Sequence, residues 1–371
     1  MVISKLVING FKSINRLSLP LDPNITLLIG PNESGKTNVL KAVEAINPEV
    51  TLDLNLTCQF SDLYKSGKPP IVDLEFSQLN KGDKEKLTNI HSSFSSIDSF
   101  ILRKEGNNQK NYKIIIKDKT FSVGSVKPLF ALIPKILYFD SLTLIKDRIN
   151  YDELTKKDNK YHVERNLLKI SGINDPSKVF DDSTHGRRAL EEASRVATER
   201  IQQVWSQEPS LEIKLRVNGK TLYIDFSDET TVYDTPKSRS NGFLWYLSFY
   251  INFLAATNDA NINEYVFLFD EPGVHLHPSG QKDLTQLLEN LSKKNQIIYT
   301  THSPFMINRN YPQRVKVITK DEKGTKVYSE AYKDNWKPLR QSIGLTIGDL
   351  FFFSNKGIIF DMPNKKKKTP A

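Results

Sequence analysis

A glycine-rich loop near the start of the chain constrains its fold more than any other feature. Residues 30–37 read Gly-Pro-Asn-Glu-Ser-Gly-Lys-Thr, which matches the pattern G-x-x-x-x-G-K-[ST]. The loop follows an apolar stretch at 25–29 and precedes a segment, 38–46, with apolar residues at helical spacing. Because strand, loop and helix occur in this order, the pattern predicts a phosphate-binding loop and not a chance glycine turn.

The residue types of this loop predict an ATP site. Glycines allow backbone amides to surround phosphate oxygens, and the helix N-terminus adds positive potential. Lys36 can bridge the β- and γ-phosphates, and the Thr37 hydroxyl can ligate Mg²⁺. We therefore expect contacts with ATP from Gly30, Pro31, Asn32, Glu33, Ser34, Gly35, Lys36, Thr37 and Asn38.

Two adjacent carboxylates follow an apolar strand in the last third of the chain. Residues 266–269 predict a buried strand, and Asp270 and Glu271 come directly after it. Ligands of α/β proteins bind at the C-terminal ends of such strands. We expect Asp270 to hold Mg²⁺ through water and Glu271, pointing the other way by strand alternation, to polarise the attacking water. Asp-Glu after a strand also fits an ordinary turn, but the glycine loop favours the ATPase interpretation.

A histidine ends the next apolar stretch. Residues 297–304 predict a further buried strand that brings His302 to its end. An imidazole there can hydrogen-bond a γ-phosphate and the attacking water. A lone histidine is more often structural, but its place after the second strand favours this role. The predicted catalytic residues are therefore Glu271, His302 and Lys36.

Composition indicates a cytoplasmic, soluble protein with no membrane partner. Charged residues make up 26% of the chain, and no apolar run approaches the roughly 20 residues that span a bilayer. The start does not resemble a secretory signal, and a single cysteine, Cys58, fits a reducing compartment. Lysines 365–368 supply four of the nine net positive charges, so the basic balance permits a nucleic-acid surface without requiring one.

The order of expected elements predicts the α/β class. A β-meander is expected over 3–8, 17–21 and 25–29, then a β-rich region at about 50–135 and a helical region at about 151–208. Asn218-Gly219 between two alternating stretches predicts a hairpin. Strand, helix and strand over 264–299 predict parallel pairing with a crossover helix.

Together these motifs resemble the ABC-type ATPase heads of the structural-maintenance-of-chromosomes (SMC), RecF and OLD (overcoming lysogenisation defect) group. The similar segments are the glycine loop, residues 8–14, residues 270–278 and residues 300–304. The resemblance implies an ATPase domain over 1–355: an ABC-type P-loop head with an N-terminal β-subdomain, a mostly parallel core sheet and a helical insertion.

Heads of this group work in pairs, with ATP between the glycine loop of one copy and a signature segment of the other. The candidate signature is residues 238–243, where Ser240 and Gly242 would aim a hydroxyl and a helix N-terminus at a γ-phosphate. It departs from Leu-Ser-Gly-Gly-Gln, and an ordinary helix N-cap is the alternative. The resemblance implies a homodimer or higher oligomer, with His275 near the seam. A Mg²⁺-sensing glutamine is not placed, because residues 136–141 occupy its expected region without one.

The resemblance is closest to OLD-type proteins without a complete Toprim nuclease domain. Sustained heptads are absent, which disfavours the chromosome-organising branch. Residues 343–360 resemble the approach to a Toprim domain, but residues 361–364 replace its Glu-Gly turn, so 356–371 is expected to be a vestigial or shortened approach with a basic tail. The implied partners are a separate nuclease-type effector and DNA, in DNA processing or anti-phage defence. The alternatives are an ATP-gated scaffold with little turnover, a RecF-like repair ATPase, a transporter-type ATPase and a simple kinase.

Overall fold

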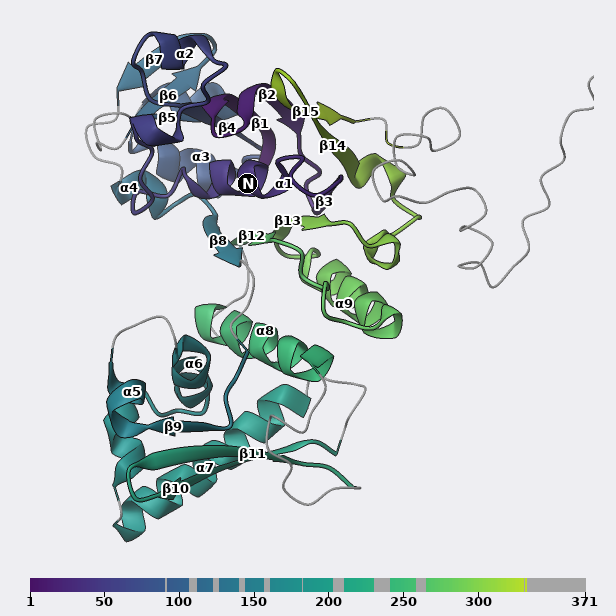
Figure 1. The fold of residues 1–371 in the computed structure, drawn as a ribbon. Helices are drawn as coiled ribbons and strands as arrows, with labels where there is room; N and C mark the ends of the chain where they lie inside the picture. The colour runs from purple at the N-terminus through teal and green to yellow at the C-terminus, as the bar shows by residue number, and fades with distance from the viewer. Residues whose placement is uncertain are drawn as a thin grey trace, which may run out of the picture.

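The computed structural model places an upper lobe of two sheets above a lower lobe of helices around a small sheet (Figure 1). It describes residues 1–90, 92–106, 112–122, 127–139, 144–156, 161–181, 183–202, 210–229, 241–257, 265–329 and 331. Ser240, Asp140, Ser141 and the Toprim-like C-terminal stretch lie outside these residues. The predicted division into domains stays a prediction.

The outer sheet of the upper lobe is antiparallel throughout. Its strands, in spatial order, are β2 (Ile14–Pro20), β1 (Val2–Phe11), β4 (Ile71–Ser77), β5 (Phe100–Glu105), β6 (Tyr112–Ile116) and β7 (Lys119–Ser122). Three short helices belong to the same part of the chain: α2 (Asp62–Lys65), α3 (Lys81–Thr88) and α4 (Lys127–Phe130).

The predicted β-meander is wrong in its third strand. β1 and β2 form an antiparallel hairpin, but β3 (Ile25–Ile29) pairs in parallel with strands from the far end of the chain. All five residues of β3 are buried. A strand buried on both faces suits the centre of a parallel sheet, which is covered on both sides, better than the edge of a meander.

The core sheet is mostly parallel, which confirms the predicted fold class. Its strands, in spatial order, are β15 (Gly324–Tyr328), β14 (Val315–Asp321), β3, β13 (Gln296–Thr301), β12 (Tyr265–Phe269) and β8 (Lys135–Phe139). Only β14 and β15 are antiparallel among these described pairs. The expected crossover helix is confirmed as α9 (Pro278–Leu291) between β12 and β13.

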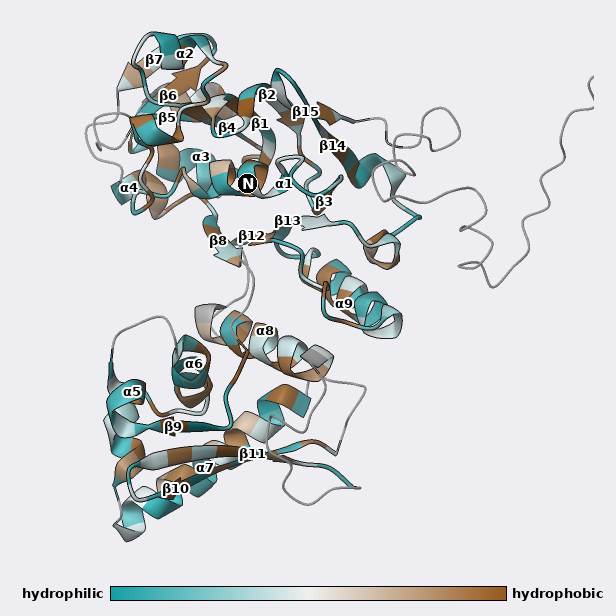
Figure 2. Cartoon of the chain, viewed as in Figure 1, coloured by the Kyte–Doolittle hydropathy of each residue, from teal (hydrophilic) through white to brown (hydrophobic). Residues whose placement is uncertain are grey.

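Helix α1 (Lys36–Glu44) lies between the two sheets. Its buried residues Val39 and Val43 pack in one cluster with outer-sheet residues such as Leu6 and with core-sheet residues such as Leu268. Alternation along β12 sends Phe267 and Phe269 to the opposite face, where they join the second core cluster. Hydrophobic residues accordingly run along β12, whereas α9 carries both hydrophobic and hydrophilic residues (Figure 2).

An apolar helix of the lower lobe, α8 (Asn241–Thr257), packs against the core sheet. Phe249 and Phe253 of α8 lie with their ring centroids 5.3 and 5.1 Å from those of Phe269 and Phe267 of β12. A helix that is apolar all round is buried on several sides. The rest of the lobe comprises α5 (Tyr151–Thr155), α6 (His162–Ile170), α7 (Thr184–Gln202), β9 (Arg148–Asn150), β10 (Glu212–Asn218) and β11 (Thr221–Ser227).

The predicted hairpin is confirmed in this lobe, with Asn218 opposite Thr221 where β10 turns into β11. No helix within the described residues combines the length and apolar character needed to cross a bilayer.

Candidate functional site

The glycine loop runs from the end of β3 into α1, beside the ends of β12 and β13 (Figure 1). A Cβ atom at Gly30 would lie 2.1 Å from the carbonyl oxygen of Ile318 on β14. Gly35 has a φ of 104°, and a Cβ there would lie 2.2 Å from Oγ1 of Thr325. Both glycines are therefore required by backbone conformation or by close approach of the core sheet.

Other loop residues differ in exposure. Pro31, Asn32 and Glu33 are exposed, and Glu33 has a φ of 60°. Ser34 is buried, and its Oγ has no hydrogen-bond partner among the described residues. The loop thus presents one exposed edge above a tightly packed base.

The base of the loop is fixed by a network of hydroxyls from distant segments. Thr325 Oγ1 donates to the Ser34 carbonyl oxygen at 3.0 Å and lies 2.8 Å from Ser13 Oγ. Asn38 Nδ2 donates to Ser13 Oγ at 2.8 Å. Ser13 comes from the β1–β2 turn and Thr325 from β15, so both sheets contribute to the loop's shape.

Lys36 is almost fully buried and turns back over its own loop. Its Nζ donates to the carbonyl oxygens of Gly30 at 2.9 Å and Pro31 at 3.0 Å. The same Nζ lies 3.5 Å from Oε1 of Glu271. The loop lysine and the second predicted carboxylate are therefore close together.

Asp270 accepts hydrogen bonds from three hydroxyls. Thr37 Oγ1 donates to Oδ2 at 2.8 Å, and Thr300 Oγ1 donates to Oδ1 at 2.6 Å. Tyr138 on β8 also reaches Oδ2, at 3.3 Å. A hydroxyl next to a carboxylate is a donor set that suits Mg²⁺, which is usually held by one or two carboxylates, waters and substrate phosphates.

Glu271 and His302 form a second contact at the end of the core sheet. His302 Nδ1 lies 3.1 Å from Glu271 Oε2, and the His302 backbone amide donates to the same oxygen at 3.3 Å. Glu271 has a φ of 51°, a conformation uncommon for residues other than glycine. Its amide donates to Thr300 Oγ1 at 2.8 Å, so one threonine contacts both acidic residues.

The predicted signature segment, residues 238–243, lies only partly within the described residues. Ser240 lies outside the described residues, whereas Gly242 is the second residue of α8. A Cβ on Gly242 would lie 3.2 Å from the carbonyl oxygen of His275. His275 itself is exposed. The start of α8 thus lies against the segment that follows Glu271 within one copy.

Sequence reasoning missed Tyr138, Thr300, Ser13 and Thr325 as site residues. Tyr138 lies in the segment 136–141 that was considered for a glutamine, on a strand that pairs in parallel with β12. The apolar character of residues 136–139 was the signal that could have placed this strand in the core sheet. Ser13 lies in the segment 8–14 that carries part of the resemblance, but nothing in the local sequence links it to Thr325, 312 residues away.

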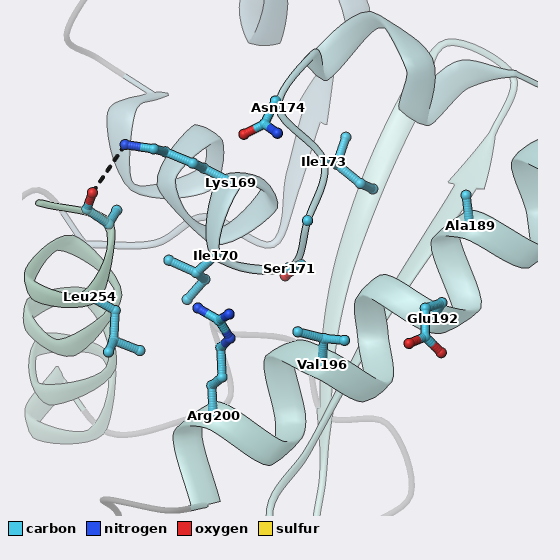
Figure 3. A pocket seen from close by; sticks show the side chains of 12 residues that line it. Lys169, Ile170, Ser171, Ile173, Asn174, Ala189, Glu192, Val196, Arg200 and Leu254 are labelled. Carbon is cyan, nitrogen blue, oxygen red and sulfur yellow. Dashed lines mark hydrogen bonds between the residues drawn. The ribbon is translucent and has the colours of Figure 1, made fainter. Parts of the chain in front are cut away.

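A separate cleft of about 520 Å³ lies in the lower lobe. Figure 3 shows Arg200 of α7 and Leu254 of α8 pointing into it, with Lys169 above them. Lys169 Nζ donates to the Ala255 carbonyl oxygen at 3.0 Å. No predicted site residue lines this cleft, and we assign it no part in the nucleotide site.

Comparison with known proteins links the chain to ATPase families. A family model described as "AAA domain, putative AbiEii toxin, Type IV TA system" matches residues 25–308. The uncharacterized protein MJECL43 of Methanocaldococcus jannaschii is 35% identical over 149 residues, which are 38% of this chain and 37% of that protein. The DNA replication and repair protein RecF of Roseiflexus castenholzii is 36% identical over 78 residues, 20% of each chain.

A longer match reaches the OLD nuclease of Thermus scotoductus, 20% identical over 367 residues that cover 86% of this chain and 62% of that protein. The chain therefore spans less than two thirds of each of these relatives. Among solved structures, an SMC head bound to the C-terminal winged-helix domain of ScpA has a TM-score of 0.53 at 14% identity, covering 88% of this chain and 97% of that one. The SMC head domain from Thermotoga maritima has a TM-score of 0.50, also at 14% identity, covering 88% and 98%. At such identities the likeness shows the fold.

Proposed function

We propose that this chain, which belongs to the AAA-domain family whose model matches residues 25–308, binds ATP with Mg²⁺ and hydrolyses it to ADP and phosphate. The chain is an ABC-type ATPase of the SMC, RecF and OLD group. The observation that carries this proposal is the contact between Thr37 and Asp270, two residues separated by 233 positions. It brings the end of the glycine loop against the carboxylates, and the Lys36–Glu271 contact joins the same two segments.

Each residue has a role in this proposal. Loop amides and the Lys36 ammonium bind the β- and γ-phosphates. Thr37 and Asp270 would hold Mg²⁺, which when bound supplies positive charge to the phosphate oxygens. Glu271 accepts the proton of the attacking water, and His302 orients Glu271 and contacts the γ-phosphate.

The proposed active unit is a homodimer or a higher oligomer. In it, Ser240, together with Gly242 at the start of α8, from one copy would face the γ-phosphate bound by the loop of another. The exposure of Pro31, Asn32 and Glu33 supports this, because the loop edge that would face the partner is open. Two heads would then close around ATP and separate after hydrolysis.

We further propose that the head, residues 1–355, controls a DNA-directed, nuclease-type effector, in DNA processing or anti-phage defence. The match to an OLD nuclease over 86% of this chain supports it. The RecF match supports DNA as the partner, since that relative is described as a DNA replication and repair protein. Localisation in the cytoplasm is part of the same proposal.

One experiment tests the core of the proposal. ATP turnover and mass by light scattering are measured for the wild type, Lys36→Ala and Glu271→Gln, with and without duplex DNA. We expect Lys36→Ala to lose ATP binding, and Glu271→Gln to bind ATP, accumulate as a closed dimer and hydrolyse on the order of 100-fold more slowly. Lys65→Ala, which removes an exposed lysine that pairs with Asp62 at 3.3 Å, is the matched control.

The outcomes separate the candidate functions. Wild-type turnover by Glu271→Gln would exclude that residue as the base. ATP-dependent dimerisation without measurable turnover in the wild type would favour the ATP-gated scaffold. Turnover that DNA does not change would argue against a DNA-directed role.

A further inference from the structure

Asp270 is held from both strands that neighbour its own. β12 lies between β13 and β8 in the core sheet. Thr300 of β13 donates to Oδ1 at 2.6 Å, and Tyr138 of β8 donates to Oδ2 at 3.3 Å. The Asp270 amide also donates to the Phe139 carbonyl oxygen at 3.0 Å. Backbone and side chain of this residue are therefore tied to β8 as well as to the loop.

The Tyr138 ring is placed by its surroundings so that its hydroxyl meets the carboxylate. The residue is partly buried, and Lys41 of α1 has its Nζ 5.9 Å from the ring centroid. The parallel register sets Tyr138 opposite Leu268, close to the end of β12. A tyrosine of this kind packs its ring along the sheet and presents one polar atom at the tip.

The hydroxyls of Tyr138 and Thr300 differ from that of Thr37 in their proposed role. Thr37 and Asp270 are the side chains proposed to hold Mg²⁺, whereas Tyr138 and Thr300 have no proposed contact with metal or nucleotide. Residues that fix the orientation of a metal ligand without touching the metal contribute strongly to metal affinity. Two fixed hydroxyls, one on each oxygen, restrict rotation of the carboxylate.

We propose that Tyr138 is a positioning residue for Asp270 and that its hydroxyl sets the affinity of the nucleotide complex for the divalent metal. Thr300 acts with it on the other carboxylate oxygen and also receives the Glu271 amide, at 2.8 Å. The inference rests on the proposed function, since it assigns Asp270 to the metal.

The test uses the full chain with Tyr138→Phe. Mn²⁺ affinity is measured by electron paramagnetic resonance in the presence of a non-hydrolysable ATP analogue, and analogue affinity is measured separately in EDTA. We expect Mn²⁺ to bind about 10-fold more weakly and the affinity for the ATP analogue in EDTA to stay unchanged. Turnover should recover as Mg²⁺ is raised, because the variant loses metal affinity and keeps Glu271 and Lys36.

Three further variants keep the result specific. Tyr265→Phe removes a phenol hydroxyl at the opposite end of the same strand pair, where Tyr265 faces Lys135, and should leave Mn²⁺ affinity unchanged. Thr300→Ser keeps a hydroxyl and should retain metal affinity, whereas Thr300→Val should lose it.

Wild-type Mn²⁺ affinity in Tyr138→Phe overturns the inference, even if the variant is less stable to heat, because only a structural role then remains. Equal loss in Tyr265→Phe overturns it as well. If the wild type fails to bind the analogue at all, the proposed function fails and this inference falls with it. If the wild type binds the metal complex and Tyr138→Phe behaves identically, only this inference fails.

Discussion

The Nζ atom of Lys36 lies 3.5 Å from Oε1 of Glu271, which links the phosphate-binding lysine directly to the proposed base. The lysine side chain is 7% exposed and the glutamate side chain 25% exposed, so solvent screens the pair only in part. A phosphate oxygen that accepts from Lys36 competes with this carboxylate and with the two loop carbonyls. Nucleotide binding and the environment of the base are therefore coupled through one ammonium group.

This coupling predicts that Glu271→Gln tightens ATP binding while it slows hydrolysis. Removing the negative charge removes a competitor for Lys36, and we expect affinity in EDTA to rise about 3-fold, the size of a weak, partly screened ion pair. Titration with a fluorescent ATP analogue measures it. Glu322→Gln, at an exposed site, makes the same change in net charge and should leave affinity unchanged. Weaker binding in Glu271→Gln would contradict the competition.

The start of α8 gives a prediction about dimerisation. Gly242→Glu places a negative charge at the helix end that would face a partner's γ-phosphate, so we expect ATP binding to persist while the ATP-dependent dimer of Glu271→Gln is lost. Light scattering of the double variant, Gly242→Glu with Glu271→Gln, measures the loss of the dimer. Gly242→Gln is the matched control, because its side chain has a similar size and meets the same His275 carbonyl oxygen, 3.2 Å from a Cβ at this position, but adds no charge, so the dimer should persist. A double variant that still forms the dimer would remove α8 from the proposed interface.

Local patterns predicted the loop and the buried strands because each depends on neighbours in sequence. The segment from Gly30 to Thr37 leads from a strand into a helix as expected, with Lys36 and Thr37 in the first turn of α1. Residues 266–269 lie in a strand buried on both faces. The pairing of β3 was not predictable in this way. Its apolar residues suit a meander and a parallel sheet equally, and its partners β13 and β14 lie in the last quarter of the chain.

Contacts within the site were predictable only as a group. The motifs place Thr37 and Asp270 after strands of one predicted sheet, at the edge where its strands end, and hence near one another. They do not specify that Tyr138 from β8 shares an oxygen of Asp270 with Thr37, because that depends on the strand order of the core sheet. The Ser13–Thr325 contact depends on two sheets meeting behind the loop, which a single sequence does not encode in any spacing.

Lys104 is expected to be essential for stability. This fully buried lysine of β5 donates to the carbonyl oxygens of Ala45, Asn47 and Val50 at 2.8, 2.9 and 2.7 Å, beyond the end of α1. Lys104→Met leaves three carbonyl oxygens, that of buried Ala45 and those of partly buried Asn47 and Val50, without this donor, which we expect to lower the free energy of unfolding by about 3 kcal/mol. Urea denaturation measures the change. Lys113→Met, on the neighbouring strand β6 and partly exposed, should cost far less.

Glu164 gives a prediction about pH and stability in the lower lobe. Burial raises the pKa of this carboxyl, and its backbone hydrogen bond from Lys146 and the charges of Lys146 and His162 offset that only in part. A raised pKa means that the folded chain holds the proton more tightly than the unfolded chain. The contribution of Glu164 to the free energy of unfolding is thus fully present below the usual pKa range of a glutamate. It is lost as the pH rises through the raised pKa of the folded chain.

Glu164→Gln removes this titration, and we therefore expect the variant to unfold at a temperature about 2 °C higher than the wild type at pH 8. The difference should shrink as the pH is lowered, because the raised pKa lets the buried wild-type carboxyl take up its proton above the usual range of a glutamate. Thermal unfolding over a series of decreasing pH values measures it, with Glu191→Gln at an exposed site of α7 as the control. A variant that is less stable at pH 8 would show that the Glu164 carboxylate stabilises the lobe in its charged form.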